Sequence, residues 1–563
     1  MYRRVTRHAL AKAMTLAAIT MATLAAPLTT LAQDKSGPEM KPLAVIALAG
    51  YDSLMEDVNF IGSLMGNPAM AEQLAPTLQA FTQGLDKTKP LGAIIQSDGM
   101  SFGGAICIPV TDLKQLVASL QLFGVMAEDA GDGLMKLTVN FQEVYAREAG
   151  GWAFISMMPE LLEGLPEDPG TLLAPIVEQY DLGIRAYVQN VPQPYREMFV
   201  QQMQQALSQG LMQLPEETAE AYEARKKIAL SQVEQLQRLV NELDEFTLGL
   251  ALDGEKQSTY LDIVYTAVPD SKLAEQIALN NDPKTNYAGF FQPDAAMMFT
   301  FASKVTEADI AQVNQMFDAL RQHVMNSIDE DSGLPSDDAR DTVKSAVSDF
   351  FDAFVSTIQA GSMDGGAVLN MTPESLTFVA GGFIAEPGKV ESGLKKLAEL
   401  AKDEPEFPGV DWNSAKHADI NFHSLSFPIP ATEAEPRQLF GEQLDVLVGI
   451  GKESVYFALG SNALEAVKGV IDASAEDAGK SVPPGELSVS LSQIMPVLAT
   501  FAKANDKAMF EMVTGMLGNE ANARDHIRIV SQTIENGART RIEAEEGVLR
   551  SFIMMGQMKQ AGQ

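Results

Sequence analysis

The chain has 563 residues, 46% of them hydrophobic, and its 41 Lys and Arg residues face 75 Asp and Glu residues, a formal net charge of −34. A field of this sign repels phosphate groups, so the composition excludes nucleic-acid binding and opposes docking on anionic lipid surfaces. The hydrophobic fraction is enough to build folded cores, and the length predicts more than one domain.

The first 32 residues have the three-part pattern of a secretory signal. Basic residues between Arg3 and Lys12 precede an apolar run over 13–26, and small side chains suited to cleavage end at Ala32. The apolar run is shorter than the roughly 20 residues that a membrane-spanning helix needs, and no later segment reaches that length. We therefore expect residues 1–32 to be a signal peptide and 33–42 a linker. The mature chain is predicted to be soluble, without a membrane span, and exported to the periplasm or the extracellular space.

The single cysteine limits the covalent chemistry. Cys107 lies in the apolar run 105–110, and one cysteine cannot form an internal disulfide bond. No histidine or other base neighbours it in the sequence. The pattern therefore predicts a buried strand residue instead of a reactive thiol.

Read in chain order, the apolar spacing predicts one series of strands and helices that occurs twice. The first series comprises strand 44–48, a helix after Tyr51, strands 92–95 and 103–110, helix 113–122, strands 152–155 and 182–187, and a strand pair at 246–252 and 259–265. The second comprises strand 297–301, a helix after Thr306, strands 366–369 and 376–384, helix 390–400, strands 455–458 and 487–491, and a strand pair at 527–534 and 539–545. Short connections favour antiparallel pairing, and interleaved helices favour the α+β class. We expect two tandem copies of an antiparallel-sheet-plus-helices domain, over 43–275 and 276–563.

A long helical segment is found only in the first half. Residues 191–243 are predicted to form a helical hairpin inserted in the first copy, with its second helix over 216–243. Five apolar residues of that helix follow a 4-3-4-3 spacing and so form one stripe: Ala229, Val233, Leu236, Val240 and Leu243. The favoured interpretation packs this stripe on the preceding helix, around 195–212. The alternative is a protein partner, or a second copy, bound through helix 216–243.

Sequence motifs for common catalytic and cofactor sites are not found. The chain has no HExxH, CxxC, CxxCH or GxSxG, no phosphate-binding loop, and no GxGxxG after a strand. No cofactor and no catalytic residue is therefore predicted. The best metal-ligand candidates are His417, Asp419 and His423, which with Asn421 would alternate onto one face of a strand. The simpler interpretation is the polar face of a half-buried strand, because 136–142 in the first half has a similar pattern.

Two further features are interpreted as structural. The acidic stretch 329–341 could bind a divalent cation weakly, but Gly333 is one residue early for a calcium-binding loop, so a solvated acidic loop is favoured. Met509, Met512 and Met516 would share one helix face, where methionine is usually core filler instead of a copper ligand.

Three classes of function remain. The absence of motifs, the duplication and the acidic surface favour a non-enzymatic binding or structural protein of the cell envelope or secreted space. A carrier for an apolar ligand is an alternative, because antiparallel sheets backed by helices can hold apolar molecules. A carboxylate-based hydrolase is another, since it needs only two Asp or Glu residues that folding brings together.

Overall fold

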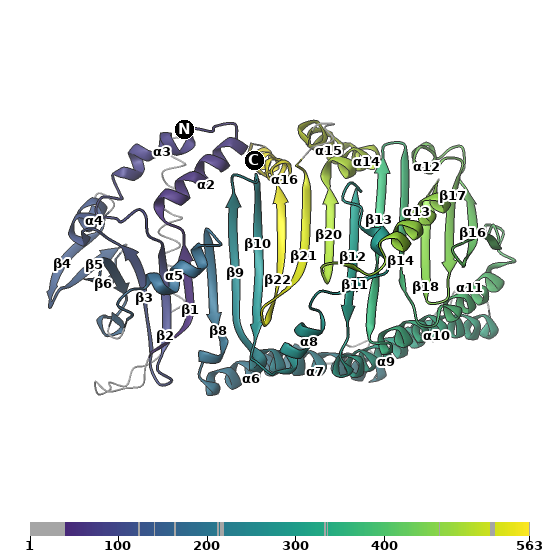
Figure 1. Ribbon diagram of the computed structural model, residues 1–563, viewed down its shortest axis with the longest axis horizontal. Coiled ribbons are helices and arrows are strands. Elements are labelled where there is room, and N and C mark those ends of the chain that lie inside the picture. The colour runs from purple at the N-terminus through teal and green to yellow at the C-terminus, as the bar shows by residue number, and fades with distance from the viewer. Residues whose placement is uncertain are drawn as a thin grey trace. The chain divides into compact units, whose positions relative to one another are not determined.

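The computed structural model describes residues 40–121, 124–139, 141–162, 165–210, 213, 219–330, 334, 336–460, 462–517 and 524–561. The predicted signal peptide and most of the linker lie outside the described residues, as do Glu216 and Gly333. The chain combines helices with extensive antiparallel β-sheet (Figure 1), so the predicted α+β class is confirmed. Its contacts divide it into two compact units. Unit 1 comprises 1–197 and 243–265, and unit 2 comprises 198–242 and 266–563.

The strands of unit 1 form one antiparallel sheet. They are β1 (Lys41–Leu48), β2 (Leu91–Ser97), β3 (Phe102–Pro109), β4 (Met126–Gly131), β5 (Leu134–Val139), β6 (Gln142–Ala149), β7 (Trp152–Ser156), β8 (Leu182–Tyr187), β9 (Leu243–Asp253) and β10 (Ser258–Ala267). Within unit 1 the strand order is β4-β5-β6-β7-β3-β2-β1-β8-β9-β10. Helices α2 (Tyr51–Leu64) and α3 (Met70–Gln79) connect β1 to β2, α4 (Leu113–Leu120) follows β3, and α5 (Gly170–Val177) precedes β8.

The core of unit 1 lies between one face of this sheet and helix α5. Strand alternation sends every second side chain of β1 to that face, where Val45 and Ala47 are fully buried. Leu173 and Ile176 of α5 pack against them in the same apolar cluster. Helix α5 therefore covers one face of the sheet only, and the opposite face does not contact it.

The strands of unit 2 also form an antiparallel sheet. They are β12 (Met297–Lys304), β13 (Ser362–Thr372), β14 (Ser375–Phe383), β15 (Asp411–His417), β16 (Ile420–Pro428), β17 (Gln443–Ile450), β18 (Ser454–Gly460), β20 (Gly485–Ser490), β21 (His526–Ile534) and β22 (Gly537–Glu545). The order is β15-β16-β17-β18-β14-β13-β12-β20-β21-β22, and the short strands β11 (Lys284–Thr285) and β19 (Lys480–Ser481) pair separately.

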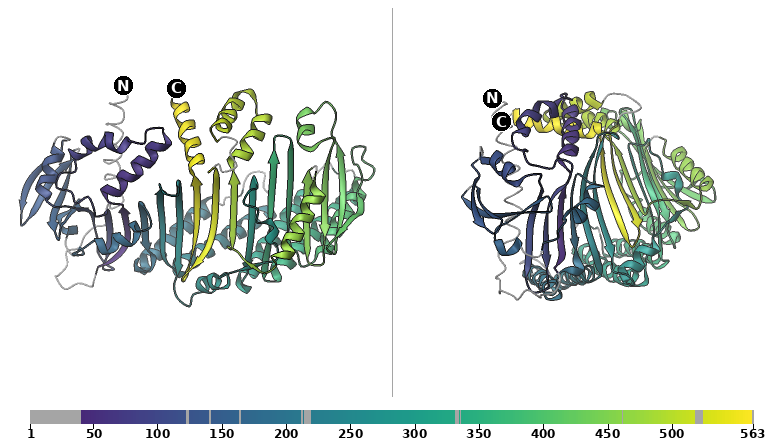
Figure 2. Two further views of the ribbon diagram at one scale, coloured as in Figure 1. Left: turned by 45° about the horizontal axis from the view of Figure 1, so that its top comes forward. Right: turned by 60° about the vertical axis from the view of Figure 1, so that its left-hand side comes forward.

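The helices of unit 2 cover one face of its sheet and the two ends of its strands. Helix α13 (Ala463–Glu476) crosses the face of β14, β17 and β18 (Figures 1 and 2), where Val467 and Val470 join a core cluster with Val368 and Phe422. The remaining helices are α8 (Lys272–Leu279), α9 (Glu307–Glu330), α10 (Asp337–Gln359), α11 (Pro387–Ala401), α12 (Ala434–Phe440), α14 (Leu491–Phe501), α15 (Ala504–Leu517) and α16 (Glu546–Ala561). In Figure 1, α9 and α10 lie along one end of the strands, and α14, α15 and α16 lie at the other.

The predicted helical insertion is present, but its packing differs from the expectation. Its helices are α6 (Gln193–Gly210) and α7 (Ala219–Glu242), and residues 198–242 group with unit 2 instead of with the first half. The reason is that α7 packs against α9, where Arg238 lies 3.7 Å from Asp309. Ala229 and Val233 of the predicted stripe are buried within the chain.

Both ends of the acidic stretch 329–341 are helical, whereas 331–333 and 335, where the loop is expected, lie outside the described residues. Asp329 lies in the last turn of α9, and Asp337 begins α10, a helix that the sequence analysis did not predict. Ser336 caps α10 by accepting the N–H of Ala339 at 3.1 Å, so the carboxylates that follow favour the positive end of the helix dipole. Among the described residues, no helix has the length and apolarity needed to cross a membrane.

Candidate functional site

The second face of the unit 2 sheet is apolar and only partly covered. We call it open face 2 and define it by side chains that the strand register places side by side. Its members are Met297, Phe299, Phe301, Ala367, Leu369, Phe378, Ala380, Val446, Val448, Phe457, Leu459, Leu487, Val489, Ile527, Ile529, Ile542 and Ala544. Every one is half-buried or exposed, and Phe299 is 40% exposed.

The contrast with the covered face is sharp along a single strand. Met298 points to the core and is 1% exposed, whereas its neighbour Phe299 points to open face 2. The same alternation separates Val368 from Leu369 on β13. Helix α13 explains the burial of one face, and the other face is equally apolar without an equivalent cover.

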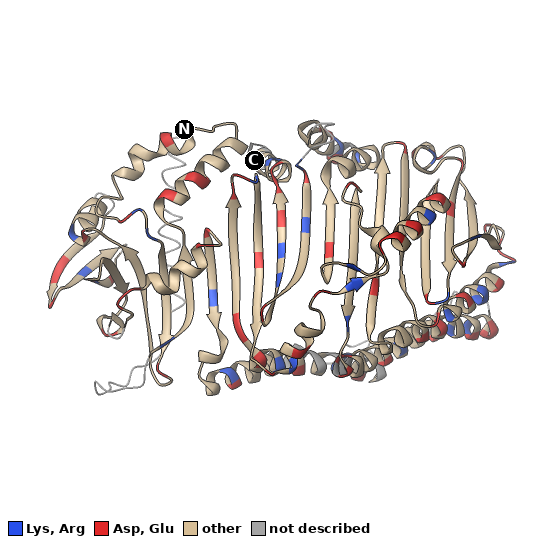
Figure 3. Cartoon of the chain, viewed as in Figure 1, with Lys and Arg blue, Asp and Glu red and all other residues tan. Residues whose placement is uncertain are grey.

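The charges of unit 2 lie elsewhere. Figure 3 shows Asp, Glu, Lys and Arg gathered on the helices, with few on the strands between β12 and β18. On β20–β22 the charged residues Glu486, Arg528 and Arg541 occupy the face opposite Leu487 and Ile529. The strands therefore keep open face 2 uncharged even where their other face is polar.

Unit 1 has a similar surface, open face 1. The register aligns side chains of β1, β8 and β9 on the face opposite α5: Ile46, Leu48, Leu182, Ile184, Phe246, Leu248 and Leu250. Four of them are large apolar residues that are 36–41% exposed, namely Leu182, Ile184, Phe246 and Leu250. Contiguous exposed apolar surface of this kind usually marks a binding site.

A separate polar cavity in unit 1 brings two carboxyl groups together. It has a volume of about 500 Å³ and lies between α2 and the segments before β8 and after β9. Asp57 of α2 and Asp181 line it, with Glu56, Glu178 and Asp253 nearby. Asp181 Oδ2 accepts the backbone N–H of Leu252 at 2.7 Å, which fixes that carboxylate.

The carboxyl group of Asp57 binds its proton unusually tightly. The pKa of Asp57 is raised to about 7, first by burial and then by the neighbouring charge and hydrogen bond of Asp181. Asp57 Oδ2 is buried and finds no donor among the described residues. With a pKa near neutrality, Asp57 can donate or accept a proton at physiological pH.

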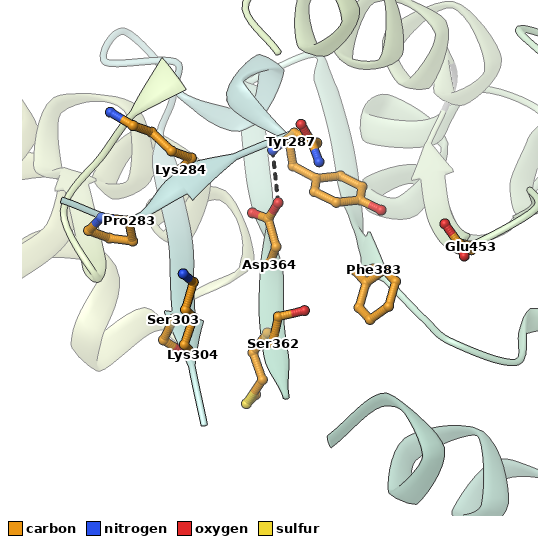
Figure 4. A pocket seen from close by; sticks show the side chains of 11 residues that line it. Pro283, Lys284, Tyr287, Ser303, Lys304, Ser362, Asp364, Phe383 and Glu453 are labelled. Atoms are coloured by element: carbon orange, nitrogen blue, oxygen red, sulfur yellow. Dashed lines mark hydrogen bonds between the residues drawn. The ribbon is translucent and has the colours of Figure 1, made fainter. Parts of the chain in front are cut away.

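A smaller cavity in unit 2, of about 330 Å³, is shown in Figure 4. Its central carboxylate, Asp364, accepts the hydroxyl of Thr285 at 2.5 Å and the N–H of Asn286 at 2.8 Å. Burial raises the pKa of Asp364, and burial also raises the pKa of Tyr287. Because Asp364 is committed to holding the segment around β11, we assign this cavity a structural role.

The metal-ligand candidates His417, Asp419 and His423 do not share a strand face, which corrects the sequence analysis. Ala418 and Asp419 form the turn between β15 and β16, both with positive φ, so the two histidines lie on different strands. His417 Nε2 lies 2.6 Å from Asp472 Oδ1. His423 is buried, and its Nδ1 accepts the N–H of Asn413 at 3.1 Å.

The comparison with 136–142 also used the wrong register. That stretch spans the turn between β5 and β6, whereas 417–423 spans the turn between β15 and β16, which stands one hairpin earlier in its sheet. The polar pattern of one therefore says nothing about the other.

His423→Gln is expected to lower the free energy of unfolding by about 1–2 kcal/mol, because it removes the acceptor of a buried hydrogen bond and the edge contact with Trp412, whose ring centre is 4.9 Å away. Burial lowers the pKa of His423 and so favours its neutral ring, and the substitution therefore removes no charge at pH 7. Urea unfolding at pH 7 measures the change. His417→Gln, at the exposed pair with Asp472, should shift it by less than about 0.5 kcal/mol. Equal effects of the two substitutions would contradict the assigned burial.

The remaining sequence candidates have structural positions. Cys107 is fully buried in β3, and burial raises the pKa of its thiol to about 12, as expected of an unreactive core residue. Met509, Met512 and Met516 are half-buried on α15, which packs against α14 and α16. Sequence analysis missed both open faces and the pair of Asp57 and Asp181.

Comparison of the chain with protein families, with curated proteins and with solved structures found no match. What the protein does must therefore be inferred from its own geometry. The two open faces and the carboxyl pair are the features that point to function.

Proposed function

We propose that the protein is an exported, non-enzymatic binding protein that carries an apolar ligand, the acyl chain of a lipid, on the open faces of its sheets. The observation that carries the proposal is open face 2. The side chains that define it are as apolar as those of the core face and none of them is buried, whereas the β16–β17 edge of the same face holds the buried His423 and Ile450. Covering a Leu or Phe side chain stabilises a complex by roughly 1.5–3 kcal/mol at most, so an acyl chain along several of them gains substantial affinity.

The chemistry of open face 2 favours an acyl chain over a protein segment. Backbone N–H and C=O groups of the central strands are already paired within the sheet, and the face presents aliphatic and aromatic side chains without charges. A protein partner normally adds polar contacts around an apolar centre. A hydrocarbon chain needs none.

The tandem arrangement remains part of the proposal. It is supported by the strand orders, since each unit places four consecutive strands at one edge, then three in reverse chain order, then its last three. Helices α5 and α13 occupy the same place along the chain. Helix α5 lies between β7 and β8, and α13 lies between β18 and β20. We propose that the two units are copies of one domain, each with one open face.

Export is proposed from the leader at 1–32, and a periplasmic or secreted carrier fits a ligand that must cross an aqueous space. Helix α7 keeps Leu230 and Leu239 exposed, at 53% and 43%. Partner binding through helix 216–243 therefore stays a prediction, as does weak divalent cation binding by the acidic surface.

Ile529→Asp is expected to weaken binding of an apolar probe at least about tenfold, because a carboxylate set against a hydrocarbon chain must lose its hydration. The measurement is a titration of the purified full chain with N-phenyl-1-naphthylamine, followed by fluorescence. Mass spectrometry of an organic extract of the protein should also detect acyl lipid.

The matched control is Val530→Asp. Val530 follows Ile529 on β21 but points to the opposite, charged face, between Glu486 and Arg541. This variant should bind the probe like the unmodified chain. The proposal is wrong if neither chain binds the probe, or if Ile529→Asp instead splits a dimer whose interface covers open face 2.

A carboxylate-based hydrolase is the second candidate, favoured by the pair of Asp57 and Asp181. One carboxyl group of such a pair is protonated and the other ionised, which is the state required to protonate a leaving group and activate water. Several further carboxylates line the same cavity, so a substrate would be neutral or cationic.

A further inference from the structure

A histidine and two carboxylates of unit 2 converge at the open end of the β21–β22 hairpin. His526 begins β21 and Glu545 ends β22, directly opposite each other, and Asp525 precedes His526. Asp525 Oδ1 lies 3.2 Å from His526 Nδ1, and Glu545 Oε2 lies 3.4 Å from the same nitrogen. All three ligand atoms lie within 4.8 Å of one another.

Each carboxylate is held in place through other contacts. Asp525 Oδ2 accepts the hydroxyl of Ser490 at 2.8 Å and the N–H of Ser492 at 2.5 Å. Glu545 Oε1 lies 3.1 Å from a guanidinium nitrogen of Arg528. Each group keeps one oxygen near His526 Nδ1, and Glu545 Oε2 also accepts the backbone N–H of His526 at 3.0 Å. Contacts outside the ligand set thus orient both carboxylates.

The cluster is shielded from solvent. Asp525 is 1% exposed, and the side chains of His526 and Glu545 are each 16% exposed. Charges at such depth need a partner of opposite sign. The two carboxylates face Arg528 and the ring of His526, so a divalent cation would take the place of the imidazole proton instead of adding to the cluster.

We propose that Asp525, His526 and Glu545 bind a divalent transition-metal ion of the zinc type, independently of the open faces. Zinc binds histidine nitrogen and carboxylate oxygen at roughly 2.0–2.2 Å, so two ligands at a tetrahedral angle stand about 3.4 Å apart. The two distances to Nδ1 match this spacing. Calcium and magnesium prefer ligand sets made only of oxygen, so the imidazole selects against them.

The alternative is a structural ion pair, in which a proton on Nδ1 bridges the two carboxylates. The pKa of His526 is raised to about 9 by its hydrogen bonds to Asp525 and Glu545, which is compatible with that proton. A metal ion would take the place of the same proton. Direct metal binding separates the two cases.

The test titrates Zn²⁺ into the chelator-treated full chain by isothermal calorimetry, with thermal unfolding measured in parallel. We expect one Zn²⁺ per chain at this site and a higher Tm with the ion. Glu545→Gln should weaken binding at least about tenfold, because it replaces a charged ligand with a neutral amide. His526→Gln should weaken it further.

His417→Gln is the matched control, since His417 also pairs with a carboxylate, Asp472, but has only one. It should leave Zn²⁺ binding unchanged. Co²⁺ added to the folded chain gives a visible absorption band that reports coordination even if a variant is less stable. No Zn²⁺ binding, or binding that His526→Gln and Glu545→Gln both retain, overturns the proposal and leaves the ion pair.

Discussion

Met298→Ala is expected to lower the free energy of unfolding by about 2–5 kcal/mol, whereas Phe299→Ala, one residue further along β12, should lower it by about 1 kcal/mol or less. Met298 is 1% exposed on the core face, so truncation leaves a cavity. Phe299 is 40% exposed on open face 2, where solvent fills the space left by the deleted ring, so no cavity adds to the loss of its contact with Phe301. The order of the effects is thus the reverse of the order of side-chain size.

Urea unfolding of the two variants measures both changes, and probe titration measures the second consequence. Phe299→Ala should weaken apolar binding while Met298→Ala leaves the affinity of the folded protein unchanged. If Phe299→Ala costs as much stability as Met298→Ala, open face 2 is covered within the chain and is not a binding surface. The adjacent positions share backbone geometry, so local strand propensity cannot account for a difference.

The apolar spacing of the sequence predicted the central strands of each sheet, because antiparallel strands follow a period of two that is visible in any one segment. It missed β4–β6 and β15–β17, at one edge of each sheet. It did not predict which face would be covered. Runs such as Met297–Phe301 and Val455–Ala458 are almost continuously apolar, which is typical of strands buried on both faces. A continuous apolar run therefore indicates that both faces of a strand are apolar. It does not indicate whether a helix of the same chain or a ligand covers the second face.

The error at His417 to His423 has a local cause. Strand alternation places His417, Asp419 and His423 on one face only if the chain stays extended, and the sequence Ala418-Asp419 does not resemble a common hairpin turn. Both residues nevertheless adopt positive φ, with values of 45° and 62°. Asp tolerates this conformation better than most residues, and that was the one available signal.

The polar clusters were beyond sequence analysis because their members are far apart in the chain. Asp57 and Asp181 belong to α2 and to the turn before β8, and only the pairing of β1 with β8 brings those segments together. Asp525 and His526 are adjacent, but Glu545 joins them through the register of the β21–β22 hairpin. A register must be known before such residues can be paired.

The pair of Asp57 and Asp181 imposes a stability cost at neutral pH, which follows from the sign of the pKa shift. The pKa of Asp57 is about 7 in the folded chain and 3.8 for an unperturbed aspartate. The folded state therefore binds the proton more tightly than the unfolded state. Stability is highest when Asp57 is protonated, and it falls as the pH rises from about 4 to about 7.

Asp57→Asn is therefore expected to raise the free energy of unfolding by about 2–3 kcal/mol at pH 8 and to change it little at pH 4. A shift of this size corresponds to about 4 kcal/mol at full effect, and the open cavity screens part of it. The asparagine amide also donates a hydrogen bond to Asp181 without carrying charge. Urea unfolding between pH 4 and pH 8 tests this. The control is Asp52→Asn, exposed in the first turn of the same helix, which should give no gain in stability at pH 8. A variant less stable than the parent at pH 8 would refute the raised pKa of Asp57. A higher free energy of unfolding for Asp57→Asn at pH 8 would mean that the ionisable Asp57 lowers the stability of the chain. Such a cost is expected of a group that transfers protons, and not of a group that only supports the fold.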